Sequence, residues 1–382
     1  MIIVFSNKKT NPACQGEGYF SEEMDGPGGL MVNAALASPT SRMEKVKDKW
    51  AGARLKGKAE SIALSEHEWA LEPVDNIGYG SFFQGLIHSM KTRKISRKWL
   101  LHVHGSGKNT LGALEQAREI QTLHGLNVIS FVWPSWTPLV SLGLVLRMAP
   151  LALKRSGLTP AKLALALGYT AVEQKLQSYG NARETARTCS SALASTIAIL
   201  EEHFIRPAAG MEGFTISMLA HSLGCLLVES LARETAIEAF EGSFANLVLN
   251  AADVDSEGHS EWASRLKISK RLYVTHNNTD AALLASRGVA GNKSRLGAKL
   301  KEAPSPNVTA YIDMSKAKGA TARHALFLID EAANPNVKRL FTSLLGGEAL
   351  FTESPGDGAL AGCRLQEGNR YSLGATKDSG KA

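Results

Sequence analysis

The sequence predicts an α/β protein with a mostly parallel, doubly wound sheet, and two observations support this fold class. First, short apolar runs alternate with segments of helical periodicity from Trp99 onward. Second, chemically useful side chains follow several of the apolar runs directly, as they do at the carboxyl ends of parallel strands. The 382 residues are 44% hydrophobic and 21% charged, which suits one large domain with additions or two modest ones.

Each element of the predicted sheet follows from a local pattern. Strands separated by helices indicate parallel pairing with helices on both faces, because each crossover returns the chain to the same edge. The first strand is WLLHVHG (99–105), the next helix ends at Gly125, and the strand NVISFVWP (127–134) is closed by Pro134. Further strands are predicted at 215–219, 244–255, 271–280 and 307–315, and a last helix at about 336–345.

Three segments lie outside this alternation. Residues 1–97 read as an N-terminal extension with one strand candidate at Ile2–Phe5, and the α/β domain spans 98–346. The tail, 347–382, is rich in glycine and polar residues and is predicted to be disordered. A helical insertion at about 138–204 interrupts the domain.

The insertion is more apolar than one exposed helix allows. It contains Leu144 and Leu146 in the stretch TPLVSLGLVLRMAPLALKR. We expect it either to cover the reacting site as a lid with an apolar acyl pocket, or to pack against the N-terminal extension.

The stretch FTISMLAHSLGCLLVESLA places a serine where a buried strand turns into a helix. Ser222 follows the apolar run, and leucines at helical spacing follow Ser222. A nucleophile elbow holds its serine in a strained backbone conformation, so bulky residues two positions away would clash. Ala220 and Gly224 occupy these positions, with alanine where glycine is usual. A helix cap is the alternative interpretation of the same pattern.

Acidic and histidine partners for this serine follow later strands. Asp280 ends the strand RLYVTHNNTD, and His324 follows the strand NVTAYIDMS. The chain order serine, aspartate, histidine is that of an α/β hydrolase, in which histidine takes the hydroxyl proton and the carboxylate fixes the imidazole. Asp253 and Asp255 compete with Asp280, because they leave the preceding strand.

The other histidines fit the role of base less well. His276 and His259 precede Asp280 and break the chain order, and His221 is expected to pack behind the elbow. His102 and His104 alternate as on a strand and lack further metal ligands nearby, so no metal site and no cofactor are predicted.

An oxyanion hole is predicted beside the serine. The turn His104-Gly105-Ser106-Gly107 follows the first strand of the alternation, and the backbone N–H groups of Ser106 and Leu223 could stabilise a transition-state oxyanion. A phosphate-binding loop is the other interpretation of HGSGKNT. It fails because position 102 is histidine rather than glycine and position 109 is asparagine.

Composition limits the partners and the compartment. The four cysteines are widely spaced and the N-terminus lacks the order of a signal peptide, so a cytoplasmic setting is expected. The net charge of +7 is modest and no aromatic residues interleave the basic runs, which makes nucleic-acid binding an unfavoured interpretation. The most apolar window is broken by Arg147 and Pro150, so no transmembrane segment is predicted. The oligomeric state is left open.

Taken together, LLHVHGSG, FVWPS, LAHSLG, LVLNAADVD, LYVTHNNTDAALLASR and RHALF resemble a bacterial branch of α/β hydrolases of unknown function. The resemblance covers about 99–345. It implies Ser222 as nucleophile, His324 as base, Asp280 as acid and the His-Gly turn as oxyanion element. The long insertion and the sequence HGSGKN depart from the branch, so the resemblance implies no substrate.

Two functions follow as hypotheses. One is a serine hydrolase that cleaves an ester, thioester or amide of a small acyl substrate through an acyl-enzyme. The other is a non-catalytic scaffold of the same fold, which binds a partner while its triad is not assembled. Labelling with a fluorophosphonate distinguishes them.

Overall fold

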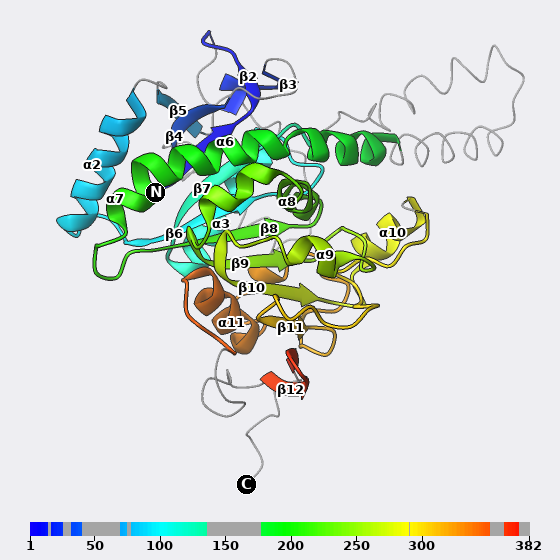
Figure 1. The fold of residues 1–382 in the computed structure, drawn as a ribbon. Helices are drawn as coiled ribbons and strands as arrows, with labels where there is room; N and C mark the ends of the chain where they lie inside the picture. Colours follow the sequence, from blue (N-terminus) through cyan, green and yellow to red (C-terminus); the bar gives the residue numbers. More distant parts are fainter. Residues whose placement is uncertain are drawn as a thin grey trace, which may run out of the picture.

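The computed structural model describes residues 1–13, 17–25, 32–39, 69–74, 78–135, 177–289, 291–351 and 363–373. Within these residues, eleven strands form one sheet in the order β12-β13-β11-β10-β9-β8-β6-β7-β1-β4-β5, and β2 pairs with β3 beside it (Figure 1). The strands are β1 Ile2–Ser6, β2 Lys8–Thr10, β3 Phe20–Met24, β4 Asn33–Pro39, β5 Trp69–Val74, β6 Lys98–Val103, β7 Asn127–Val132, β8 Thr215–His221, β9 Phe244–Asn250, β10 Ser269–His276, β11 Ala310–Asp313, β12 Cys363–Glu367 and β13 Arg370–Leu373. The helices are α2 Tyr79–Lys91, α3 Thr110–His124, α6 Ser190–Leu200, α7 Arg206–Ala208, α8 Gly224–Ala232, α9 His259–Ala263, α10 Ala281–Val289 and α11 Pro335–Leu345.

The centre of the sheet is parallel, as the sequence predicts. Each neighbouring pair from β1 through β7, β6, β8, β9, β10 and β11 runs parallel. Strand β6 lies between β7 and β8, so the chain leaves β6 toward one side of the sheet and later returns on its other side. Ligands of such sheets bind at this change of direction, outside the carboxyl ends of the strands. The site is therefore expected where β6 and β8 end.

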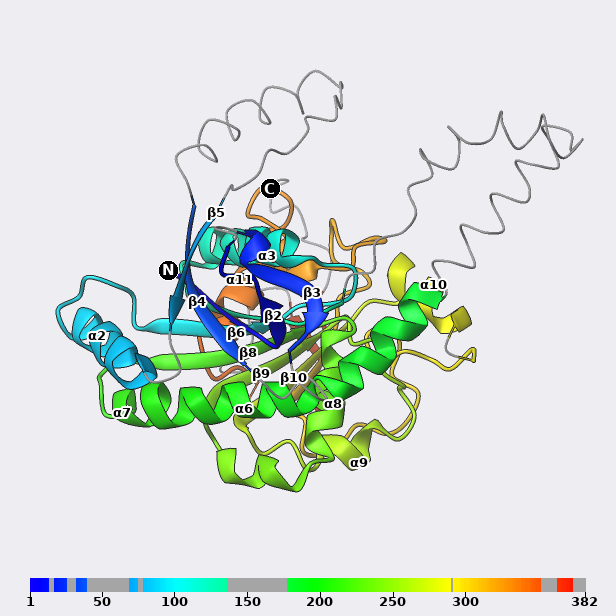
Figure 2. The same ribbon diagram turned by 90° about the horizontal axis from the view of Figure 1, so that it is seen from above.

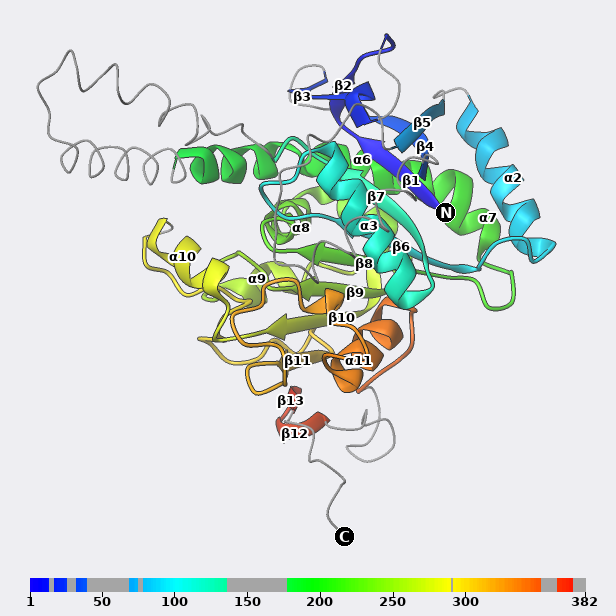
Figure 3. The same cartoon turned by 180° about the vertical axis from the view of Figure 1, so that it is seen from behind.

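Helices cover both faces of the sheet, and each face has its own apolar core. Helices α2, α6, α8 and α9 contribute to one buried cluster, and α3 and α11 contribute to the other (Figures 2 and 3). Adjacent residues of one strand point to opposite clusters, as Leu100 and Leu101 do. Strands buried on both faces read as continuous apolar runs, which is why β6 and β8 were recognisable.

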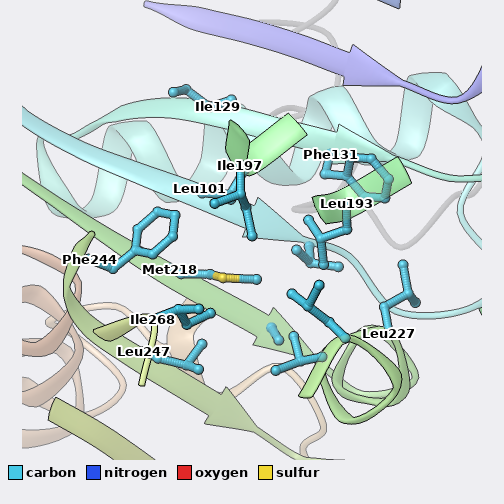
Figure 4. Close-up of a cluster of buried hydrophobic side chains, with 14 of the residues drawn as sticks. Leu101, Ile129, Phe131, Leu193, Ile197, Met218, Leu227, Phe244, Leu247 and Ile268 are labelled. Atoms are coloured by element: carbon cyan, nitrogen blue, oxygen red, sulfur yellow. The ribbon is translucent and has the colours of Figure 1, made fainter. Parts of the chain in front are cut away.

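The cluster beneath α6 and α8 holds the elbow strand in place. Met218 of β8 lies among Leu101 of β6 and Leu247 of β9, and Leu193 and Ile197 of α6 reach the same cluster (Figure 4). All five side chains are fully buried. Burial of a leucine-sized side chain contributes about 1.5–3 kcal/mol to the free energy of folding. This packing therefore fixes the position of the backbone at the end of β8.

Three described strands of the N-terminal segment, 1–97, belong to the large sheet, although the sequence suggested an extension. Strand β1 pairs parallel with β7, and the predicted candidate Ile2–Phe5 corresponds to this strand. Strands β4 and β5 then continue the sheet in antiparallel pairing. The sequence NAALASP of β4 is dominated by small residues with weak strand preference, and so tertiary pairing rather than local propensity decides its structure.

Within the C-terminal tail predicted to be disordered, 347–382, the described residues 363–373 form strands. Strands β12 and β13 form an antiparallel hairpin, and β13 pairs parallel with β11. Cys363 and Leu373 are buried in this hairpin. The other residues of the hairpin are mostly polar, so its sequence lacks a strand pattern. The hairpin is stabilised by pairing with the edge of β11.

The predicted helical insertion at 138–204 is only partly described. Leu144 and Leu146 lie outside the described residues, so the lid hypothesis stays a prediction. From residue 177 the chain is helical, and α6, a π-helical turn at Glu201–Ile205 and α7 continue it. This helical run connects to β8 and packs in the same layer as α8, which makes it a crossover element of the sheet.

Candidate active site

Ser222 lies at a strained turn between β8 and α8. Its backbone φ is +54°, in the left-handed region that side chains with a Cβ rarely adopt. The Ser222 N–H donates to the carbonyl of Asn250 at 3.0 Å, and the Ser222 carbonyl accepts the Asp253 N–H at 3.1 Å. Two hydrogen bonds, one to the last residue of β9 and one to the loop that follows it, therefore hold the strained residue. Such strain persists only where the surroundings fix it, and it concentrates at functional sites.

Two glycines allow the elbow to approach the end of β6. A Cβ on Gly224 would lie 2.6 Å from the carbonyl oxygen of Val103, and a Cβ on Gly105 would lie 2.8 Å from the Ser222 Cβ. Neither distance is tolerated, because both meet backbone or a fixed Cβ. Ala220, at the other small position, is fully buried in β8. The small residues predicted around Ser222 are thus required by close packing, most strictly at Gly224.

The turn after β6 is held rigidly next to Ser222. His104 donates from Nδ1 to the Gly105 carbonyl at 2.8 Å, and its Nε2 accepts the Trp133 N–H at 3.2 Å. The Gly107 N–H donates to the Ser135 carbonyl at 3.0 Å. His104 is therefore a structural residue of the turn, and desolvation by burial keeps its pKa well below the ordinary value.

The two predicted oxyanion donors, Ser106 and Leu223, directly follow Gly105 and Ser222, the two residues that approach each other closely. The N–H groups of Ser106 and Leu223 have no hydrogen-bond acceptor among the described residues. Leu223 is fully buried. A buried N–H without a partner is costly, so it marks a place where a ligand oxygen could bind.

His324 and Asp280 are hydrogen bonded to each other. The His324 Nδ1 lies 2.7 Å from Asp280 Oδ2, and Asp280 is fully buried. The other carboxylate oxygen accepts the N–H groups of Ala282 and Leu283 and so caps α10. Because an ionised carboxylate only accepts, the His324 proton sits on Nδ1 and Nε2 is left as an acceptor.

The loop that carries His324 is tied to the loop after β10. The Asn277 side-chain amide donates to the carbonyls of Ala320 at 2.8 Å and Arg323 at 3.2 Å. Thr279 Oγ1 accepts the Ala322 N–H at 3.2 Å. Neither Asn277 nor Thr279 belongs to a catalytic motif that the sequence shows. Both lie inside the predicted strand 271–280, whereas β10 ends at His276, so the sequence did not mark them as loop residues.

The two competing aspartates have other partners. Asp253 is buried and accepts hydrogen bonds from Tyr179 and Ser286, and Arg295 Nε lies 3.5 Å from it. Asp255 pairs with Lys293 at 3.0 Å and with Arg295 at 2.6 Å. Within the described residues, neither carboxylate is hydrogen bonded to a histidine. Tyr179, Ser286 and Arg295 were not singled out from the sequence, which offered no pattern to find them.

His259, His276, His102 and His221 were the other histidines considered for the base. His259 Nε2 hydrogen bonds to Tyr311 at 2.6 Å, and His276 Nδ1 lies 3.8 Å from Asp313. His221 was expected to pack behind the elbow, but its side chain lines the pocket, with its ring centre 4.7 Å from that of His324. Desolvation by burial keeps the pKa of His221 well below its ordinary value and lowers the pKa of His102 to about 3. The described residues contain no cluster of three metal ligands.

A pocket of about 810 Å³ brings the candidate residues together. Ser222 and His324 both line it, with Ser106 at the turn after β6, although no hydrogen bond joins the Ser222 and His324 side chains within the described residues. Catalytic hydrogen bonds are often long in the absence of substrate. Helix α10 lies beyond the carboxyl ends of β9 and β10 (Figure 1), and three of its residues line the pocket. The lining residues are Gly105, Ser106, Gly107, Lys108, Gln116, Tyr179, His221, Ser222, Asp253, Ala282, Ala285, Ser286, His324, Ala325 and Leu328.

A mostly parallel sheet with a serine at the turn from strand to helix defines the class of α/β hydrolases. The chain belongs to the family described as alpha/beta hydrolases of unknown function (DUF900), whose model matches residues 82–343. This match covers more than half of the chain and confirms the family inferred from the motifs. Neither a curated protein nor a solved structure matches the sequence. No helix in the described part of the chain has the length and apolar character needed to cross a membrane.

Proposed function

We propose that this protein is a serine hydrolase that cleaves an ester, thioester or amide through an acyl-enzyme, with Ser222, His324 and Asp280 as its triad. One observation carries the proposal. A serine in a strained elbow and a histidine already bonded to a buried carboxylate line the same pocket. Asp253 and Asp255 are not part of the proposed triad, because Asp280 is the carboxylate bonded to His324.

The proposed mechanism assigns one step to each residue. His324 Nε2 removes the proton of the Ser222 hydroxyl while Oγ attacks the carbonyl carbon of the substrate. The oxyanion of the tetrahedral intermediate accepts hydrogen bonds from the Ser106 and Leu223 N–H groups. His324 then gives the proton to the leaving alcohol, thiol or amine. Water attacks the acyl-enzyme in the same way and frees Ser222.

Asp280 has two tasks in this mechanism. Its Oδ2 stabilises the imidazolium form of His324, and its Oδ1 caps α10. Both oxygens thus have partners, and the carboxylate cannot rotate without loss of a hydrogen bond. The preorganised pair avoids a rearrangement at the moment of proton transfer.

A labelling experiment tests the proposal. Wild-type protein is treated with a fluorophosphonate, and the modified residue is identified by mass spectrometry. We expect one adduct on Ser222, no adduct in the folded Ser222→Ala variant, and loss of hydrolysis of 4-nitrophenyl butyrate in that variant. Ser264→Ala, an exposed serine after α9, serves as the matched control and should keep both properties.

Two results would contradict the proposal. Labelling of a different serine would remove Ser222 from the mechanism. No labelling of correctly folded protein would favour the alternative function, a non-catalytic scaffold that uses the same pocket for binding.

A further inference from the structure

The polar side chains of the pocket include two groups that differ in whether their polar atoms have partners. The first group is Asp253 with Tyr179 and Ser286, and here the polar atoms satisfy one another. Tyr179 and Ser286 donate to the two carboxylate oxygens, and Arg295, which is buried, compensates the charge of Asp253. Desolvation by burial raises the pKa of Tyr179, so its hydroxyl stays protonated. This group has no free charge to offer a substrate.

The second group is Lys108, Gln116 and His221, and here the polar atoms lack partners. No carboxylate lies within 4 Å of the Lys108 ammonium among the described residues. Gln116 and His221 are 5% and 6% exposed. Neither the Oε1 nor the Nε2 of Gln116, and neither ring nitrogen of His221, has a hydrogen-bond partner among the described residues. Buried polar atoms are nearly always paired, so such a group needs an explanation.

The backbone places Lys108 toward this group. Lys108 follows the oxyanion turn, and its Cδ would lie 3.2 Å from a Cβ on Gly112, so the side chain folds across the first turn of α3. Gln116 projects from the same helix, one turn further on, and both residues line the pocket. The Lys108 side chain is half-exposed and lies against the first turn of α3.

The ionisable lining residues of the pocket differ in whether their charge has an ion-pair partner. Its ionisable lining residues are Lys108, Tyr179, His221, Asp253 and His324. Asp253 is compensated by Arg295, and burial keeps His221 neutral through its lowered pKa. His324 is compensated by Asp280 when it becomes charged. Lys108 is the charge left without compensation in the described pocket.

We propose that Lys108, Gln116 and His221 form a subsite that binds an anionic group of the substrate, a carboxylate or a phosphate, next to Ser222. This inference rests on the proposed function, because it names the class of ester or amide that Ser222 attacks. The three residues offer suitable donors: the ammonium of Lys108, the Nε2 of Gln116 and one ring N–H of neutral His221. The apolar remainder of the substrate then lies against Ala282, Ala285 and Leu328.

Ester selectivity is the first test. The kcat/KM is measured for 4-nitrophenyl butyrate and for the 4-nitrophenyl monoester of glutarate, which carries a carboxylate. In Lys108→Gln, the ratio of anionic to neutral ester should fall about tenfold to a hundredfold, the value of a hydrogen bond to a charged group. Gln116→Glu, which places a carboxylate beside the lysine, should lower the ratio as well.

Lys94→Gln is the matched control for selectivity. Lys94 is exposed and precedes the amino end of β6, at the opposite end of the sheet from the pocket. Its removal changes the net charge by the same amount as Lys108→Gln. The ratio should therefore be the same in Lys94→Gln as in the wild type.

Anion binding is the second test and needs no catalysis. Glutarate and inorganic phosphate are titrated separately into wild type, Lys108→Gln and Lys94→Gln by calorimetry. We expect one anion to bind the wild type and Lys94→Gln and to bind Lys108→Gln at least tenfold more weakly. The anion that binds distinguishes a carboxylate subsite from a phosphate subsite.

The two tests separate this inference from the proposed function. If no ester is hydrolysed but anion binding depends on Lys108, the subsite stands and the hydrolase proposal fails. If esters are hydrolysed at Ser222 with a ratio that Lys108→Gln does not change, the subsite is refuted and the hydrolase stands. Absence of anion binding in the wild type, together with no preference for the anionic ester, also refutes the subsite.

Discussion

The loops after β9 and β10 each carry a buried aspartate, but the two aspartates have different hydrogen-bond partners. Both leave neighbouring parallel strands at the same edge of the sheet, both carry a buried aspartate, and both aspartates bind α10. Asp280 of the second loop is bonded to His324, whereas Asp253 of the first loop is bonded to Tyr179 and Ser286. The partners of each aspartate, not its place after a strand, distinguish the proposed triad member Asp280 from Asp253.

The difference has a physical origin in what faces each loop. The loop after β10 faces the segment after β11, and Asn277 and Thr279 fix that segment so that His324 meets Asp280. The loop after β9 faces helix 177–188 and the buried Arg295 instead. It also binds the Ser222 backbone, so its role is to hold the elbow. Three predictions test this comparison.

The largest effect is expected from the exchange of each aspartate for asparagine. In Asp280→Asn the amide can hold the wrong tautomer of His324, and kcat should fall by up to about ten-thousandfold. In Asp253→Asn and Asp255→Asn, no histidine loses its partner, and the main loss should be in the free energy of unfolding. Steady-state kinetics on 4-nitrophenyl butyrate and circular dichroism of each variant measure the two effects. A larger loss of kcat in Asp253→Asn or Asp255→Asn would reverse the assignment of the two loops.

A smaller effect is expected on stability when Arg295 is replaced. Arg295→Met removes the buried cation that compensates Asp253 and Asp255, and loss of one partner of a buried pair costs about 3–5 kcal/mol. Lys293→Met is the control, because this exposed partner of Asp255 contributes less than about 1 kcal/mol. Urea unfolding gives both values. Equal losses in the two variants would mean that the loop after β9 is not held by a buried ion pair.

The smallest effect is expected on the pH dependence of the free energy of unfolding. It tests whether a buried histidine, rather than the aspartates of the two loops, makes the protein sensitive to acid. His102 has a pKa of about 3 in the folded protein, because burial desolvates it, against 6.5 for an exposed imidazole. Between these values the unfolded chain binds a proton that the folded chain does not, so stability falls as the pH drops below 6.5. For one histidine the loss from pH 7 to 5 is about 2 kcal/mol.

The replacement of His102 makes this acid test specific. In His102→Leu the unfolding free energy should fall less between pH 7 and pH 5 than in the wild type, by about that 2 kcal/mol. Urea unfolding at the two pH values measures the difference. The same pH dependence in both proteins would assign acid sensitivity to other groups, the aspartates of the two loops among them.

Local sequence patterns were sufficient for the central sheet and for the elbow. Strands β6, β7 and β8 are apolar on both faces, so their runs stand out from the polar residues that flank them. Strands β4, β12 and β13 have small or polar residues and were not predicted, since pairing with a neighbour decides their structure. The same limit applies to Lys108 and Gln116, whose shared pocket depends on how α3 meets the end of β6.

The sequence by itself determined the parallel sheet, the family and the position of Ser222, because these depend on residues close together in the chain. Ala220, Ser222 and Gly224 lie within five residues of one another, and their small size already required a tight turn. Only the tertiary structure decided which aspartate meets His324. That choice depends on contacts across the sheet between segments more than 40 residues apart, such as Asp280 with His324, and no local pattern encodes which of several buried carboxylates a distant loop will reach.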